Sequence, residues 1–173
     1  MKKILFLLIL MSFFYSCKGT PPTNDLNIPM GLECTDTTPS LPLRIYFYGY
    51  NPEPDFSGYN IYISTTHSSW SSMQSLVDQH ISNGGFSSSI NNNIISSVQG
   101  GNTYPTIPSY SLSQVSAGAQ KVEFQINYDG ASNGLNLAVS YYIGITAIDL
   151  NNVLESKISN IIKVDSSSCT GVN

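Results

Sequence analysis

The chain has 173 residues, enough for one domain with a hydrophobic core and hardly enough for two. Charged residues make up only 10% of it and the formal net charge is −4, so it lacks the basic surface that nucleic-acid binding needs. Val, Ile, Leu and aromatic residues recur throughout, which excludes a disordered chain. Abundant Ser, Asn, Gly and Tyr fill the remaining positions and favour a β-rich extracellular domain with long polar loops.

The N-terminus has the layout of a signal peptide over residues 1–16. Two lysines precede the apolar run Ile4–Tyr15, which is too short to span a bilayer but long enough for the core of a signal peptide. The run leads into Ser16 and Cys17, a small residue before a Cys, which resembles the lipobox of bacterial lipoproteins. The resemblance implies that Cys17 is lipidated and becomes the first residue of the mature chain. Ordinary secretion with a free thiol and an uncleaved anchor are the alternatives.

The mature chain is predicted to have three parts. Residues 17–27 form a lipidated tether, because "KGTPPTNDLN" is polar and contains Pro; the folded domain covers 28–169, and 170–173 form a short tail. After cleavage the chain has five positive and eleven acidic residues, a net charge of −6. Membrane attachment therefore depends on lipid rather than on charge. Lys18 follows Cys17 in place of the Asp that retains many Gram-negative lipoproteins in the inner membrane, which favours the outer membrane, facing either the exterior or the periplasm.

Cysteine count supports lipidation, because three is an odd number in an exported chain. With Cys17 lipidated, Cys34 and Cys169 remain as a pair near the two ends of the folded part. A bridge that closes a loop of about 135 residues stabilises by roughly 4–5 kcal/mol in the chain-entropy model. Two unrelated thiols are the alternative.

Five segments alternate between apolar and polar residues, and with a first strand near "IPMGLEC" they predict the six strands of an antiparallel β-sandwich. The five segments are "LRIYFYG", "GYNIYIS", "VEFQINY", "YYIGITAID" and "ISNIIKVD". Alternation predicts that the inward-facing residues are Leu43, Ile45, Phe47, Tyr59, Ile61, Ile63, Val122, Phe124, Ile126, Tyr128, Tyr141, Ile143, Ile145, Ala147, Ile162 and Val164.

The order of these segments resembles that of the fibronectin type III domain over 28–64 and 121–165. A Pro-rich turn, "NPEPDFS", precedes the strand "GYNIYIS", and Leu135 lies six residues before Tyr141. The resemblance implies a two-sheet sandwich in which Tyr141 is the corner tyrosine, with its hydroxyl bonded to the backbone near Leu135. Phe47 stands where the family usually has Trp, which keeps an aromatic core.

An insert of about 65–120 interrupts the resemblance. Its first part, "SSWSSMQSLVDQHISNGG", predicts a short amphipathic helix that Ser68 or Ser69 caps and an Asn-Gly pair ends. The apolar stripe of this helix consists of Trp70, Met73, Val77 and Ile81. We expect the stripe to pack on the sandwich over Tyr46 and Tyr48; a grip for a partner is the alternative. The rest of the insert is rich in Ser and Asn and is long enough for an extra hairpin.

Few residues offer catalytic or metal-binding chemistry. His67 and His80 flank the predicted helix without a cluster at metal-ligand spacing, and we expect His80 to face water. Glu53, Asp55 and Asp149 lie at turns, where carboxylates bind backbone N–H groups more often than calcium. Serine-rich loops are usually solvated, and no Gly-rich phosphate loop follows a strand. The sequence therefore predicts neither an enzyme nor a cofactor.

Aromatic residues outside the predicted core are the candidate binding residues. They are Tyr46, Tyr48, Tyr62, Trp70, Tyr104, Tyr110 and Tyr142. Exposed Tyr and Trp offer large apolar area at low entropy cost, although the insert is long enough to cover them. We therefore expect a non-catalytic lipoprotein that binds another macromolecule, as an adhesin or as an accessory of an envelope assembly. Carbohydrate binding through Tyr and Trp is the alternative.

Overall fold

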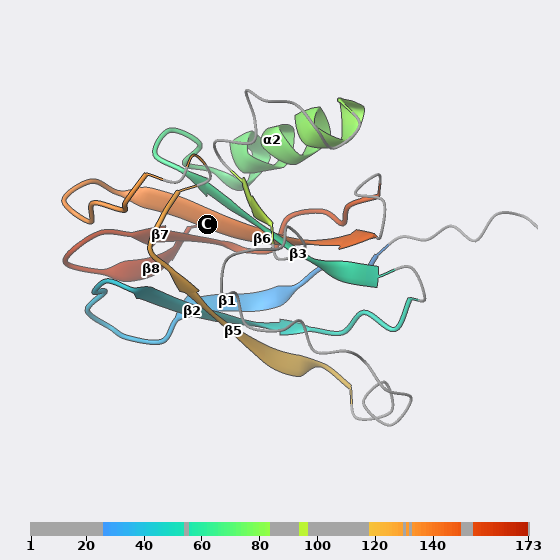
Figure 1. Cartoon of the computed structure of the whole chain (residues 1–173), viewed down its shortest axis with the longest axis horizontal. Helices are drawn as coiled ribbons and strands as arrows, with labels where there is room; N and C mark the ends of the chain where they lie inside the picture. Colours follow the sequence, from blue (N-terminus) through green and yellow to red (C-terminus); the bar gives the residue numbers. More distant parts are fainter. Residues whose placement is uncertain are drawn as a thin grey trace, which may run out of the picture.

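The computed structural model describes residues 26–53, 56–83, 94–96, 118–129, 131, 133–149 and 154–172. Within these ranges the chain forms eight strands and one helix. The strands make two antiparallel sheets that pack as a sandwich (Figure 1), which confirms the predicted architecture.

The smaller sheet has three strands, in the order β1-β2-β5. Their bounds are β1 (Met30–Cys34), β2 (Leu43–Gly49) and β5 (Gln120–Ile126). Burial alternates strictly along β5 from Lys121 onward, and β2 buries every second side chain from Leu43 to Gly49. In the register of the sheet, Tyr46 of β2 lies between Glu33 of β1 and Glu123 of β5. One face of this sheet therefore belongs to the core and the other to the surface.

The larger sheet has five strands, in the order β4-β3-β6-β7-β8. Their bounds are β3 (Phe56–Ser64), β4 (Ile94–Ser96), β6 (Tyr141–Asp149), β7 (Ile161–Val164) and β8 (Cys169–Val172). Neither β4 nor β8 was predicted, and most of β8 falls in the expected tail at 170–173. Thr170 and Gly171 of β8 are both exposed, so its sequence lacks the apolar alternation that marks a strand. A turn creates this strand instead: the Asp165 carboxylate accepts the backbone N–H groups of Ser167 and Ser168.

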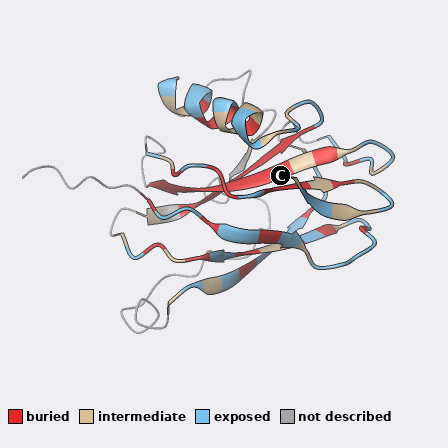
Figure 2. Cartoon of the chain, turned by 180° about the vertical axis from the view of Figure 1, so that it is seen from behind, coloured by how far each residue is buried: buried red, intermediate tan, exposed pale blue. Residues whose placement is uncertain are grey.

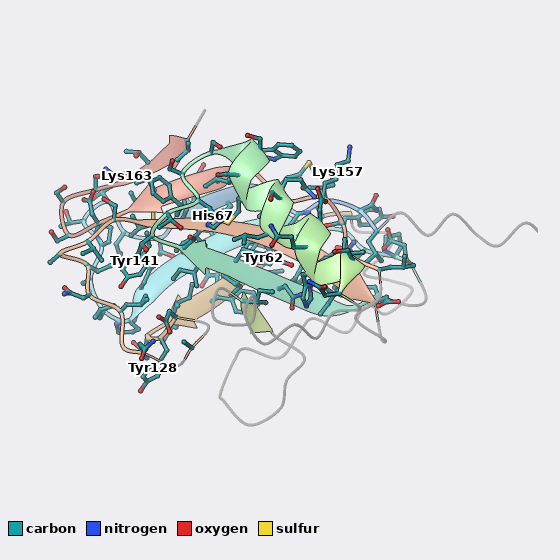
Figure 3. The ribbon with its side chains drawn as sticks, turned by 90° about the horizontal axis from the view of Figure 1, so that it is seen from above. Tyr62, His67, Tyr128, Tyr141, Lys157 and Lys163 are labelled. Carbon is teal, nitrogen blue, oxygen red and sulfur yellow. A yellow bond between two sulfur atoms is a disulfide. The ribbon has the colours of Figure 1, made fainter. Side chains whose placement is uncertain are left out.

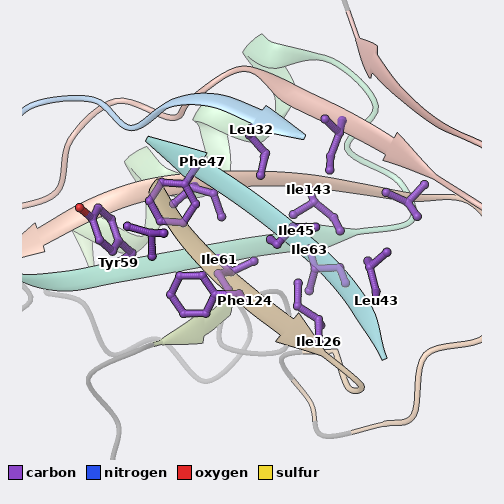
Figure 4. Close-up of a cluster of buried hydrophobic side chains, with 14 of the residues drawn as sticks. Leu32, Leu43, Ile45, Phe47, Tyr59, Ile61, Ile63, Phe124, Ile126 and Ile143 are labelled. Carbon is purple, nitrogen blue, oxygen red and sulfur yellow. The ribbon is translucent and has the colours of Figure 1, made fainter. Parts of the chain in front are cut away.

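The core lies between the sheets and includes packed aromatic rings among aliphatic side chains (Figure 4). Phe47 contacts Tyr59 edge-on at a centroid distance of 4.7 Å and stacks on Phe124 at 5.7 Å. The predicted inward-facing residues are buried here with one exception. Tyr128 is 53% exposed, because β5 ends at Ile126.

The Tyr128 prediction was wrong because the chain turns back directly after β5. Across this turn the backbone N–H of Leu135 donates to the carbonyl of Asn127. The backbone N–H of Asp129 donates to the carbonyl of Asn133. The turn brings Leu135 into the core and places Tyr141 beside it. The hydroxyl of Tyr141 accepts the N–H of the residue after Leu135, at 3.2 Å. This is the bond expected of a corner tyrosine.

A disulfide joins the two sheets at one edge. Cys34 of β1 is bonded to Cys169 of β8, with Cα atoms 6.2 Å apart, as predicted. Beside it, the side-chain amide of Asn160 binds both backbone groups of Leu32, accepting its N–H at 2.9 Å and donating to its carbonyl at 2.8 Å. The amide thus takes the place of a neighbouring strand along part of β1.

The predicted helix is present as α2 (Trp70–Ser82), with Ser69 and Ser72 in a reciprocal capping box. It lies on the outer face of the five-stranded sheet, on the side of the sandwich away from β1, β2 and β5 (Figure 1). The expectation that it packs over Tyr46 and Tyr48 was therefore wrong. Only five residues separate β3 from α2, so the helix covers the sheet to which β3 belongs.

Candidate binding face

The outer surface of the three-stranded sheet carries two outward-pointing tyrosines, the half-buried Tyr46 and the exposed Tyr48. We call it the tyrosine face and define it by Met30, Glu33, Tyr46, Tyr48, Lys121 and Glu123. Tyr48 is 42% exposed and Met30, its partner in the β1–β2 register, is 61% exposed. Exposed residues run along this sheet, whereas β6 in the other sheet is buried almost throughout (Figure 2). The predicted outward direction of Tyr46 and Tyr48 is confirmed.

Neighbouring rings and backbone hold the two tyrosines in place. Tyr46 and Tyr48 meet edge to face, with ring centroids 6.2 Å apart. The Tyr48 ring also lies against Gly31, where a Cβ would come within 3.3 Å of the ring. Gly31 has a φ of +64°, a conformation that other residues rarely adopt. Because Gly31 has no side chain, the Tyr48 ring can lie close to β1.

Charged neighbours fix the Tyr46 ring. The Nζ of Lys121 lies 4.1 Å from the ring centroid and 2.7 Å from Oε1 of Glu123. The Tyr46 hydroxyl donates to Oε2 of Glu33 at 2.5 Å, and this hydrogen bond raises the pKa of Tyr46 above its usual value. The hydrogen bond from Lys121 lowers the pKa of Glu123. The face thus presents a phenol beside two carboxyl side chains and one lysine amine.

Tyr62 points away from the sandwich core, as predicted, but it is fully buried rather than exposed. In Figure 3, α2 crosses the sheet above it. Met73, Val77 and Ile161 belong to the same apolar cluster as Tyr62, on the outer side of the sheet. The expectation that Tyr62 is available for binding was therefore wrong, because alternation gives the direction of a side chain and not what covers it.

A buried polar network lies beside Tyr62. The carboxylate of Glu155 accepts hydrogen bonds from Tyr62 at 2.9 Å, from Asn60 at 3.0 Å and from the hydroxyl of Thr146. Its other oxygen lies 2.8 Å from Nδ1 of His80. Burial, followed by the charge of Glu155, strongly raises the pKa of Tyr62, so its hydroxyl remains a proton donor.

The expectation that His80 faces water was wrong. Its side chain is 5% exposed and that of Glu155 only 2%. His80 lies seven residues after Met73 and therefore on the same face of the helix, a signal that the sequence contains. The sequence around Glu155 gives no such signal. The network anchors the C-terminal half of α2 to the sheet, since a buried charge needs its partners to be satisfied.

The remaining aromatic candidates do not join the tyrosine face. Trp70 is 42% exposed, but its indole Nε1 donates to the carbonyl of Ile158 at 3.2 Å, which fixes the start of α2 on the other sheet. Tyr142 is half-buried and packs against the cluster beneath α2. Tyr104 and Tyr110 lie outside the described residues.

Other chemistry is sparse in the part of the chain that the structure describes, where no three His, Cys, Asp or Glu side chains are grouped to hold a metal ion. His67 Nδ1 lies 2.9 Å from the hydroxyl of Ser64, but that hydroxyl also accepts the backbone N–H of Thr66 and of His67. The pair therefore closes a turn after β3 (Figure 3). Glu53 accepts the N–H of Asn27 at 2.9 Å. Asp149 is buried, and Asp55 lies outside the described residues.

One groove, of about 350 Å³, lies beside the disulfide between β1 and β8. Its polar lining includes Glu33, Asp36, Asn160 and Thr170. Glu33 belongs to both the groove and the tyrosine face, so the two surfaces adjoin at the edge of β1.

None of the helices in the described part of the chain is long and apolar enough to cross a membrane. The chain matches no known protein-family model, no curated protein and no solved structure.

Proposed function

We propose that this chain is a lipid-anchored, non-catalytic protein of the bacterial outer membrane that binds another macromolecule through its tyrosine face. The fold is proposed to be a fibronectin type III-like sandwich, and Cys17 is proposed to carry the lipid. The partner is a protein or a glycan.

Strand order supports the fibronectin type III-like assignment. Lettered along the chain, β1, β2 and β5 take the places of strands A, B and E, which form one sheet of an immunoglobulin-like sandwich. Strands β4, β3, β6 and β7 take the places of C′, C, F and G in the other sheet. The bond to the Tyr141 hydroxyl and the buried Phe47 agree with this assignment. Helix α2 and strand β8 are additions to it.

The residues before the domain support the anchor. The basic start, the apolar run and Ser16 before Cys17 are the features of a lipoprotein signal. Since Cys34 and Cys169 are bonded to each other, Cys17 is left as the third cysteine. Its lipidation explains the odd count.

The binding proposal rests on one observation: one outer face of the sandwich is covered and the other is exposed. Helix α2 covers the five-stranded sheet, whereas Tyr48 and Met30 stay exposed on the three-stranded sheet. Fixed aromatic side chains and exposed Met are typical of the centre of a protein interface, because rigid rings lose little entropy on binding. A protein partner is favoured over a sugar, since Lys121 lies over the Tyr46 ring and Gly31 lies against the Tyr48 ring.

Photocrosslinking tests the binding face directly. The full chain, with Tyr48 replaced by a benzophenone amino acid, is expressed in its native host and intact cells are irradiated. We expect a covalent adduct at position 48, and digestion of the adduct with proteases or glycosidases assigns its class. A matched variant carries the probe at Tyr128, which is 53% exposed outside the tyrosine face. No adduct at position 48, or equal yields at both positions, would contradict the proposal.

The anchor is tested separately. Mass spectrometry of the mature chain is expected to find acyl groups on Cys17, and Cys17→Ser is expected to release the protein from the membrane fraction. An unmodified Cys17 would remove the anchor and leave the binding test unaffected.

A further inference from the structure

Among the described residues, no strand pairs with the outer edge of the three-stranded sheet at β5. Among the described residues β5 pairs with β2 alone, and it is the outermost strand of its sheet (Figure 1). The opposite edge, at β1, is closed by the Asn160 amide and by the disulfide. An open edge offers backbone N–H and carbonyl groups to an added strand.

Charges on β5 determine which strand fits this edge. Lys121 and Glu123 lie on the outer face of the strand, 43% and 62% exposed, and form an ion pair at 2.7 Å. Val122 and Phe124 lie on the inner face and are buried. A positive and a negative charge, two residues apart on one face, form a pattern that is complementary to its own antiparallel copy.

We propose that β5 pairs antiparallel with β5 of a second copy of this chain, around a two-fold axis at Val122. The buried side chains of both copies must lie on the same face of the joined sheet. Only registers in which the two-fold axis passes through a residue meet this condition. A register centred on Lys121 or on Glu123 places like charges opposite each other. A register centred on Phe124 brings no opposite charges together. Centring on Val122 places each Lys121 opposite Glu123 of the other copy, which gives two ion pairs.

This pairing joins two three-stranded sheets into one continuous six-stranded sheet. Both tyrosine faces then lie on the same side, so the dimer presents two copies of the face to one partner. A strand edge buries less surface than a standard interface, so we expect association in solution to be weak. Confinement of both copies to one membrane would raise their local concentration.

Mixing of charge variants tests the register. Full chains with two different tags are mixed in detergent at concentrations above the expected dissociation constant and chemically crosslinked, and one tag is then used to capture the other. The wild-type chain is expected to capture itself, whereas K121E and E123K each lose self-capture by about tenfold or more, because like charges oppose each other. A mixture of K121E with E123K is expected to restore capture, since each chain then carries the charges that complement the other. Restoration by mixing cannot arise from the ion pair within one chain.

A matched control separates this contact from general charge effects. Lys163, 38% exposed and paired with Asp165 outside β5, is replaced in K163E, which is expected to capture like wild type. Absent wild-type capture, or equal capture by every mixture, would overturn the proposal. So would capture by the single variants alone. The result does not depend on lipid at Cys17 or on the partner of the tyrosine face, so it can fail while the proposed function stands.

Discussion

The two outer faces of the sandwich start from the same sequence pattern and end in opposite environments. Tyr46 and Tyr48 alternate outward from β2, and Tyr62 alternates outward from β3. Tyr48 is 42% exposed, whereas Tyr62 is fully buried beneath α2. Period-two alternation therefore separates core from outer face but does not separate a covered outer face from an open one. Substitutions matched between the two faces test this difference.

The largest expected effect is at Glu155. Replacing Glu155 with Ala removes the carboxylate that His80, Tyr62, Asn60 and Thr146 share. We therefore expect the free energy of unfolding to fall by about 3–5 kcal/mol. The single Trp of the chain, Trp70, lies in α2, so its fluorescence follows the helix during urea unfolding while circular dichroism follows the sheets.

The matched control for Glu155 is Glu33→Ala on the tyrosine face. Glu33 is exposed and accepts one side-chain hydrogen bond, so its loss is expected to change stability by less than about 1 kcal/mol. Equal losses for the two variants would mean that the buried network does not hold α2.

Two methionines give the next largest contrast. Met73 of α2 is fully buried against the sheet, and Met73→Ala should destabilise by about 2–4 kcal/mol through lost packing and an unfilled cavity. Met30 is 61% exposed on the tyrosine face, and Met30→Ala should stay within about 0.5 kcal/mol. Chemical denaturation measures both, and a large loss for Met30→Ala would show that the tyrosine face is covered.

The smallest effect concerns Tyr46 and is seen in its pH dependence. The hydrogen bond to Glu33 raises the pKa of Tyr46 above its unfolded value of 10.0. Its stabilising contribution is therefore complete below that pH and is lost as the pH rises through the folded-state pKa. The unfolding free energies of wild type and Tyr46→Phe are compared at pH 8 and above pH 10. We expect wild type to lose stability relative to the variant, and an unchanged difference would contradict the Tyr46–Glu33 bond.

Much of the sandwich could be predicted, because local patterns determine it. Alternation identified the inward residues of β2, β3 and β6, and the odd cysteine count identified the bond between Cys34 and Cys169. Strand β8 could not be predicted, because a turn stabilised by Asp165 forms it without an apolar pattern.

The environment of each outer face could not be predicted, because distant contacts set it. His80 meets Glu155 across 75 residues, and Trp70 reaches Ile158 across 88. The neighbours of Tyr46 also come from two other strands, so Lys121 and Glu33 gained their roles only once the register was known. The prediction that these tyrosines point outward was therefore correct, but Tyr62 lies on the covered face.

The contrast between the two faces is tested most directly by hydroxyl-radical footprinting of the full chain, with oxidation at single residues measured by mass spectrometry. Tyr48 and Tyr62 have the same intrinsic reactivity, so the ratio of their oxidation rates reports their exposure. We expect Tyr48 to be oxidised on the order of tenfold faster than Tyr62, because Tyr62 reacts only when α2 opens. Equal rates, or faster oxidation of Tyr62, would contradict a sandwich with one covered and one open outer face.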